Sequence, residues 1–294
     1  MLTIQQMEVA YKEQKALLIK NPITFADGDR IGIIGSNGAG KSTLIHAILG
    51  LIPYKGSIST NIDIQQIAVH LQFNEYSDTM PVRYIMETIL NTKIKNDTKL
   101  QELIAYFEFE DCLKKKYSAL SGGQKQRLTI IMVLMQDAPL TFFDEVTSGL
   151  DFETRQRLME KLESWYEKRN NTLCIVSHYY EELERLVSKL LILDQGCVIA
   201  YGEKEQLFKK YCGKAVLIVE RSAENEGLLK DFRQIEAQAQ SIAIPCETLS
   251  EEEQVVHLLL QENINFRRSD HDIEMIFLNA KKDYYDKHQN MERK

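Results

Sequence analysis

The stretch GSNGAGKST, residues Gly35 to Thr43, decides how the rest of this chain is interpreted. It matches the pattern GxxxxGKS/T, in which glycines let the backbone wrap closely around phosphate groups and backbone N–H groups form an anion site. The apolar stretch DRIGIIG before it predicts a buried strand, and KSTLIHAILGLI at its end is apolar at helical spacing. A strand, a glycine loop and a helix in this order predict an α/β unit that holds a phosphate group.

Individual residues of the loop suit a nucleotide. Lys41 can neutralise the charges of the β- and γ-phosphates, and Ser42 can reach a Mg²⁺ ion bound with them. A glycine turn without a ligand is the alternative, and the strand and helix on either side argue against it. The residues expected to bind nucleotide through this loop are Gly35, Ser36, Asn37, Gly38, Ala39, Gly40, Lys41, Ser42 and Thr43.

A second apolar stretch, PLTFFDE, ends in two acids, Asp144 and Glu145. It predicts a buried strand, and α/β sheets bind their ligands at the carboxyl ends of such strands. We expect Asp144 to hold Mg²⁺, directly or through water, and Glu145 to polarise the attacking water as a general base. A strand that ends in two acids is common, so this interpretation depends on the phosphate loop upstream.

The stretch LSGGQKQR, residues 120–127, also has the features of an anion site. A serine and two glycines stand directly before the helical run LTIIMVLM, an arrangement that aims backbone N–H groups at an anion. It lacks a lysine and hydroxyl pair at the spacing that would complete a nucleotide site. By itself, therefore, this stretch predicts only part of a site.

The order of the apolar stretches predicts how the chain is organised. The 294 residues are enough for one large domain or two. Short strands are expected at 2–10 and 23–26, and later strands alternate with helices, which predicts a mostly parallel sheet in a first domain of residues 1–212. PVRYIMETIL and KLQELIAYF predict a helical subdomain inserted at about residues 73–135.

The composition changes after about Gly213, and residues 213–294 predict a small C-terminal α/β accessory domain with a charged tail. AVLIV, SIAIP and INFRR are expected to be strands, and residues 227–240, 251–263 and about 272–280 to be helices. The charged residues 281–294 are expected to fray.

Composition excludes some classes of function. The net charge of −7 argues against a dedicated nucleic-acid binder, which would show a basic surface. The five cysteines are widely spaced and form no CxxC pair, which favours a reduced cytosolic compartment over a zinc or disulfide framework. No stretch approaches the length of a membrane span, and the first residues lack a signal-peptide profile, so a membrane role would depend on a partner.

The order GSNGAGKST, Gln72, LSGGQKQR, TFFDE, SGLD (Ser148 to Asp151) and His178 resembles that of the ATP-binding cassette (ABC) ATPases, over about residues 1–205. LSGGQ is the discriminating element, because phosphate loops occur in many unrelated NTPases. The resemblance implies a P-loop NTPase core with N-terminal antiparallel strands and an inserted helical subdomain.

The resemblance assigns further roles, although each of these residues alone would more often be structural. Tyr11 would stack on adenine, and Gln72 would touch Mg²⁺ or the water and link the core to the helical lobe. His178 would contact the γ-phosphate and join Lys41, Gln72 and Glu145 in catalysis. Metal binding would involve Ser42, Gln72 and Asp144.

The same resemblance makes LSGGQKQR half of a site completed by a second molecule. Ser121, Gly122, Gly123 and Gln124 would contact ATP held by the partner's phosphate loop, and Asp151 would communicate across the dimer. One cassette is encoded here, which implies a homodimer, or a heterodimer with a related cassette. ATP and Mg²⁺ are the implied cofactors.

The implied setting is the cytoplasmic face of a membrane, where the chain would bind an integral membrane transporter subunit and no nucleic acid. The end of the chain, INFRRSDHDIEMIFLNA, resembles the closing segment of cassette subunits of ABC-2-type exporters for peptides, drugs, lipids or glycans. An importer ATPase with a C-terminal regulatory domain and a non-transport ABC ATPase are the alternatives. Whether the appendage regulates or only stabilises a dimer stays open.

Two positions depart from the family pattern. Ser36 and Val146 stand where many members have proline, in the phosphate loop and after the catalytic glutamate. Neither change removes a donor, a charge or a base, so we expect altered loop stiffness and no loss of hydrolysis.

Overall fold

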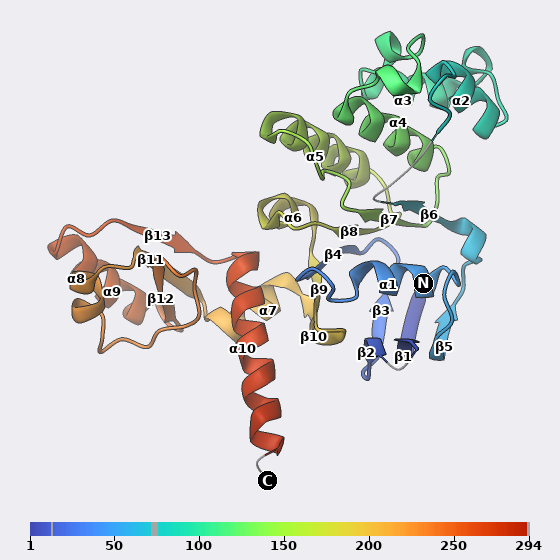
Figure 1. The fold of residues 1–294 in the computed structure, drawn as a ribbon. Helices are drawn as coiled ribbons and strands as arrows, with labels where there is room; N and C mark the ends of the chain where they lie inside the picture. The colour runs from blue at the N-terminus through green and yellow to red at the C-terminus, as the bar shows by residue number, and fades with distance from the viewer. Residues whose placement is uncertain (13, 72–75, 293–294) are drawn as a thin grey trace.

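The computed structural model describes residues 1–12, 14–71 and 76–292. Figure 1 shows three regions: a large sheet with its helices, a helical lobe formed by α2, α3 and α4, and a C-terminal appendage. Within the described ranges, no helix combines the length and the apolar character that a membrane crossing requires.

The centre of the large sheet is parallel. Its strands lie side by side in the order β9 (Lys189–Asp194), β4 (Arg30–Gly35), β8 (Thr172–Val176), β7 (Leu140–Asp144) and β6 (Ile67–His70). Every residue of β7 and β8 is buried, as expected for strands covered on both faces. The predicted parallel core is confirmed, and all five strands end at the edge that carries the phosphate loop.

The rest of this sheet is mostly antiparallel, which confirms the predicted N-terminal strands. β1 (Leu2–Tyr11) pairs with β2 (Gln14–Ile19), β3 (Ile23–Phe25) and β5 (Lys55–Thr60). β10 (Cys197–Glu203) pairs antiparallel with β9 and meets β2 in a single parallel bridge, which joins the two parts.

Helices cover the faces of the sheet and connect its strands. α1 (Lys41–Ile48) follows β4, α5 (Phe152–Glu167) follows β7, α6 (Tyr180–Leu186) follows β8 and α7 (Lys204–Cys212) follows β10. The helix predicted from KSTLIHAILGLI is confirmed as α1, which ends at Ile48, whereas α6 and α7 were not predicted. Short 3₁₀ helices occupy Ile64–Gln66, Ile94–Asn96, Glu110–Cys112 and Tyr117–Ala119.

The helical lobe consists of α2 (Val82–Ile89), α3 (Thr98–Tyr106) and α4 (Gly122–Leu134). Pro81 precedes the first turn of α2, and the Asp97 side chain caps α3 by accepting the N–H of Leu100 at 2.9 Å. The apolar faces of these helices share one continuous core with the neighbouring parallel strands. In Figure 1 the lobe stands beyond the β6–β7 side of the sheet.

The appendage contains a separate antiparallel sheet, in which β11 (Ala215–Glu220) lies between β12 (Ser241–Cys246) and β13 (Phe266–Ser269). α8 (Ala223–Leu228) and α9 (Leu249–Gln261) accompany it, and Figure 1 shows this group on the side of the molecule away from β1–β3. The three predicted strands and the helix near 251–263 are confirmed.

The helix predicted for residues 227–240 is wrong. α8 ends at Leu228, and residues 229–240 form turns and irregular backbone. Leu229 is buried, and Ile235 forms an isolated antiparallel bridge to Ala243 of β12. Leu229 lies in a turn and Ile235 in the bridge to β12, so these apolar residues are fully or partly buried without being helical. Their spacing along the sequence matches that of a helix by coincidence.

The fraying predicted for the tail is also wrong for the described residues. α10 runs from Ile273 to Glu292 and is continuous with the helix expected at 272–280. It packs against α7, α6 and β10 of the large unit. Figure 1 shows α10 between the appendage and the large sheet, with its second half extending past the appendage.

Candidate active site

The phosphate loop connects the end of β4 to the start of α1. A Cβ atom on Gly35 would lie 2.1 Å from the carbonyl oxygen of Leu193, so only glycine fits there. Gly40 caps α1 at φ 100°, a left-handed conformation that glycine adopts without strain. The N-terminus of α1 therefore points into the concave side of the loop, and its backbone N–H groups favour an anion there.

Lys41 is held inside this loop. Its Nζ donates to the carbonyl oxygens of Gly35 at 2.8 Å and Ser36 at 3.1 Å. Burial lowers the pKa of Lys41, while the nearby carboxylates of Glu145 and Asp144 act in the opposite direction. The result is an ammonium group at the centre of the loop, where phosphate charges would be neutralised.

Ser42 and Asp144 meet directly. The Ser42 hydroxyl donates to Oδ2 of Asp144 at 2.8 Å, although the two residues are far apart in sequence. Asp144 is buried at the end of β7, and burial raises its pKa despite the hydrogen bond from Ser42. A hydroxyl and a carboxylate are the hard oxygen ligands that Mg²⁺ takes beside phosphate groups, so the residues present fit this ion.

Glu145 and His178 meet across the ends of two neighbouring strands. β7 and β8 are parallel and in register, with Asp144 opposite Val176, so the loops that follow them are adjacent. Glu145 adopts a positive φ of 51°, its N–H donates to the Val176 carbonyl at 3.0 Å, and its Oε1 lies 2.7 Å from Nε2 of His178. A non-glycine residue in this conformation is uncommon and is typical of functional loops.

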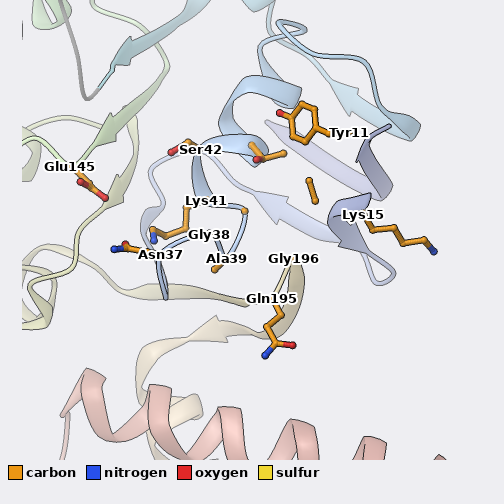
Figure 2. Close-up of a pocket in the computed structure, with 13 residues that line it drawn as sticks. Tyr11, Lys15, Asn37, Gly38, Ala39, Lys41, Ser42, Glu145, Gln195 and Gly196 are labelled. Atoms are coloured by element: carbon orange, nitrogen blue, oxygen red, sulfur yellow. The ribbon is translucent and has the colours of Figure 1, made fainter. Parts of the chain in front are cut away.

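Lys41, Ser42 and Glu145 line one open pocket of about 520 Å³, whereas Asp144 and His178 contact these lining residues from behind and do not line it. Figure 2 shows Tyr11 and Lys15 on one side of the phosphate loop and Glu145 on the other, with Gln195 and Gly196 below. Tyr11 is 52% exposed at the end of β1, so its ring is accessible to a ligand. The lining residues are Tyr11, Lys15, Ala16, Asn37, Gly38, Ala39, Gly40, Lys41, Ser42, Thr43, Glu145, Gln195 and Gly196.

The LSGGQ stretch lies elsewhere. Ser121 caps α4 by accepting the N–H of Gln124 at 3.3 Å, and the Gln124 side chain accepts the N–H of Ser121 at 3.1 Å. Asp151 caps α5 by accepting the N–H of Thr154 at 3.0 Å, and this bond lowers its pKa. Neither the residues of this stretch nor Asp151 are among the described residues that line the pocket. Gln72 falls outside the described residues.

Comparison with known proteins identifies the family. A family model described as ABC transporter matches residues 21–148. The Nod factor export ATP-binding protein I of Bradyrhizobium diazoefficiens is 31% identical over 217 residues, which are 68% of this chain and 70% of that protein. This chain belongs to the ABC transporter family. As a member of that family it binds ATP, hydrolyses it and couples hydrolysis to transport.

Two further relatives match a greater share of this ABC protein. The linearmycin resistance ATP-binding protein LnrL of Bacillus subtilis is 29% identical over 80% of this chain and 79% of its own. The methionine import ATP-binding protein MetN of Corynebacterium glutamicum is 30% identical over 74% of this chain and 68% of its own. These similarities extend beyond the residues that the family model matches.

Solved ABC structures share the fold. The ATP-binding subunit of an ABC transporter has a TM-score of 0.63 at 23% identity and covers 71% of this chain and 92% of its own. A dimeric ATP-binding cassette in a post-hydrolysis state, bound to ADP and Pi, has a TM-score of 0.60 at 21% identity and covers 69% and 98%. The predicted fold class is confirmed.

Sequence reasoning missed one buried acid next to this candidate site, Glu182 on α6. Its Oε2 accepts hydrogen bonds from the hydroxyls of Thr147 and Ser177, each at 2.9 Å, and Arg155 Nε lies 3.0 Å from its Oε1. Glu182 thereby joins the loop after Glu145 to the loop that carries His178. An acid four residues after His178 was the available signal, and its partners are visible only in three dimensions.

Lys15 and Gln195 were also missed. Lys15 reaches the pocket from the start of β2, and Gln195 reaches it from the turn between β9 and β10. No local motif marks either residue, because its place depends on the pairing of distant strands.

Proposed function

We propose that this chain is the ATP-hydrolysing subunit of an ABC exporter and that a separate membrane subunit moves the substrate. The convergence of Lys41, Asp144 and the Glu145–His178 pair on one phosphate loop carries the proposal for hydrolysis. The names of the Nod factor export and linearmycin resistance relatives support the direction of transport. A peptide, drug, lipid or glycan is the proposed class of substrate.

One observation favours a second candidate. The methionine import relative matches 74% of this chain, so an importer ATPase whose C-terminal appendage regulates it is the alternative. A non-transport ABC ATPase has less support, because none of these three relatives carries such a name. The topology of the membrane partner would separate an importer from an exporter.

The proposed chemistry is the attack of water on the γ-phosphate of ATP. The phosphate loop, Gly35 to Thr43, would bind the phosphates with Lys41 neutralising their charge. Ser42, Asp144 and Gln72 would hold Mg²⁺, which supplies positive charge to the phosphate oxygens. Glu145 would accept the proton of the attacking water, His178 would contact the γ-phosphate, and Gln72 would touch Mg²⁺ or the water.

Tyr11 would stack on the adenine base. Its exposed ring at the rim of the pocket supports this role, and stacking requires only an aromatic face. Lys15 would lie near the same end of the nucleotide.

We also propose that two cassettes share each ATP. Ser121, Gly122, Gly123 and Gln124 form an exposed or partly exposed helix start, and it is absent from the described lining of the pocket in its own chain. A second chain could present this start to the γ-phosphate, with Asp151 beside the interface. The partner would be another copy of this chain or a related cassette, and a C2 dimer would give two complete sites.

The proposed division into domains is residues 1–212 for the ATPase, including a helical subdomain at about 73–135, and 213–294 for the accessory domain. The two sheets lie on either side of this boundary. The ATPase would be peripheral on the cytoplasmic face of the membrane, bound through its transporter subunit and not to nucleic acid.

The test is reconstitution. The chain is purified together with the membrane protein that it retains, and the pair is placed in vesicles with ATP on the side of the ATPase. We expect substrate to move away from the ATP-containing side. Movement toward that side would identify an importer, and a chain that retains no membrane protein when it is purified from its own membranes would contradict the proposed membrane partner.

A further inference from the structure

Asp194, at the end of β9, lies between the phosphate loop and the C-terminal helix. Its side chain is 1% exposed. Oδ1 accepts a hydrogen bond from the Ser36 hydroxyl at 2.6 Å. Oδ2 accepts one from the Tyr285 hydroxyl at 2.8 Å and lies 3.1 Å from Nζ of Lys281. One buried carboxylate thus connects the loop to two residues of α10.

The connection continues to the centre of the ATP site. The carbonyl oxygen of Ser36 accepts a hydrogen bond from Lys41 Nζ, and its side chain bonds to Asp194. The next two residues after Asp194, Gln195 and Gly196, line the nucleotide pocket, and the Gly196 N–H donates to the Ala39 carbonyl at 3.2 Å. A displacement of Asp194 would therefore move both sides of the loop.

The charge of Asp194 makes its partners important. A carboxylate beside the phosphate loop repels the phosphates of a nucleotide, and this repulsion is strong where water is excluded. Burial alone would raise the pKa of Asp194, but the bonds from Ser36, Tyr285 and Lys281 together lower it and keep the group ionised. The Lys281 ammonium therefore cancels a negative charge that would otherwise face the ATP site.

We propose that Lys281 and Tyr285 of α10 are positioning residues for the phosphate loop, which act through Asp194 to set the affinity for ATP. This inference rests on the assignment of the phosphate loop as the ATP site. It gives the C-terminal appendage a defined route to the nucleotide, since α10 also carries contacts to the small domain: Lys282 pairs with Glu236 at 2.7 Å. Because binding linkage is reciprocal, ATP tightens the docking of α10.

The test compares two adjacent lysines. Lys281→Met removes the partner of Asp194, whereas Lys282→Met removes a similar ion pair with Glu236 that does not touch the loop. The affinity of the full-length chain for a non-hydrolysable ATP analogue with Mg²⁺ is measured by calorimetry. We expect Lys281→Met to weaken binding about fivefold or more, within the usual range of coupling between sites. Lys282→Met should bind as the wild type does.

A charge-neutral double variant makes the test specific. Asp194→Asn removes the negative charge but leaves an amide oxygen that accepts the Ser36 hydrogen bond. Asp194→Asn combined with Lys281→Met should therefore recover most of the affinity that Lys281→Met loses. Tyr285→Phe removes a single donor from Asp194 and should weaken binding by a smaller factor than Lys281→Met.

Each outcome decides the proposal. Equal affinities for the Lys281→Met, Lys282→Met and wild-type chains would overturn it. A lower melting temperature of Lys281→Met at unchanged affinity would also overturn it, because the Lys281–Asp194 pair would then stabilise the fold without affecting ATP binding. Lys41→Ala is measured in parallel: if it also binds the analogue normally, the assignment of the ATP site is what fails.

Discussion

Nε2 of His178 lies 2.7 Å from Oε1 of Glu145, although the two residues follow different strands. The contact exists because β7 and β8 are parallel neighbours in register, so their loops leave the sheet side by side. It places the proposed general base against the residue proposed to sense the γ-phosphate. The pair is therefore organised before a nucleotide arrives.

The first prediction concerns Glu145→Gln. The amide keeps the shape of the side chain and can still bond to His178, but it cannot accept a proton from water. We expect kcat to fall by about 100-fold or more, as for loss of a general base, while ATP binding persists and a stable dimer accumulates. Phosphate release and light scattering with ATP measure both effects.

The matched control is Glu153→Gln, because Glu153 is an exposed acid on the first turn of α5, close in sequence and paired only with Arg157 in the described structure. It should hydrolyse ATP at the wild-type rate. A Glu145→Gln chain that stayed monomeric with ATP and still turned over would remove the proposed role of Glu145.

The residues of the proposed ATP site could be named from sequence where their chemistry is local. The phosphate loop, the acids at the end of β7 and the serine and glycines that begin the helix of the LSGGQ stretch are each encoded within a few residues. Their patterns follow from backbone geometry, which a short stretch determines.

The remaining features depend on distant parts of the chain. Lys15 reaches the pocket only because β1 and β2 pair, and Asp194 meets Lys281 only because α10 folds back on the large sheet. The charge of the tail predicted a frayed end, because no local pattern shows that Lys281 pairs with Asp194 of the large sheet. For residues 227–240, apolar spacing favoured a helix, but contacts with the small sheet decided the structure.

The second prediction tests the shared site by complementation. Gly122→Asp should fold normally, because an added Cβ meets only Leu150 Cδ2 at 3.9 Å and an acid suits the start of a helix. Its carboxylate would repel a γ-phosphate brought by a partner. The Gly122→Asp and Lys41→Ala chains should each be inactive, and Gly122→Ala should retain more activity than Gly122→Asp.

Mixing the two inactive chains should restore hydrolysis. A mixed dimer contains one intact site, formed by Lys41 of one chain and Gly122 of the other. If half of the dimers are mixed, activity should recover to about a quarter of the wild-type value for a C2 dimer with independent sites. No recovery in dimers shown to be mixed would mean that the LSGGQ stretch does not complete the partner's site.

The third prediction follows from the raised pKa of Asp144. Burial favours the protonated acid in the folded state, so the stability from this group is complete below the unfolded pKa and is lost as pH rises through the folded pKa. At pH 7 the ionised carboxylate therefore destabilises the nucleotide-free protein. Asp144→Asn should raise the melting temperature at pH 7, and the gain should vanish below about pH 4, near the unfolded pKa.

In the wild type, ATP with Mg²⁺ should raise the melting temperature more than ATP with EDTA does. In Asp144→Asn this difference between the two conditions should disappear. Asp231→Asn, at an exposed position of the appendage, is the control and should change neither result. If Asp144→Asn lowered the melting temperature at pH 7, its carboxylate would be stabilising the fold and the argument from burial would fail.

The last prediction concerns Glu182, whose side chain is 8% exposed and whose partner Arg155 is 15% exposed. Glu182→Ala leaves the Arg155 guanidinium without its carboxylate in a site largely closed to water, and it removes the acceptor for Thr147 and Ser177. We expect the free energy of unfolding, measured by urea titration, to fall by about 3 kcal/mol, as for a buried ion pair that loses one member.

The control is Glu163→Ala, which breaks a more exposed pair with Arg185, at 4.0 Å, and should cost less than about 1 kcal/mol in the same urea titration. Because Glu182 also fixes the loop of His178, Glu182→Ala should lower kcat more than it weakens ATP binding. If Glu182→Ala and Glu163→Ala lost equal amounts of stability and of kcat, the connection between these loops would contribute nothing.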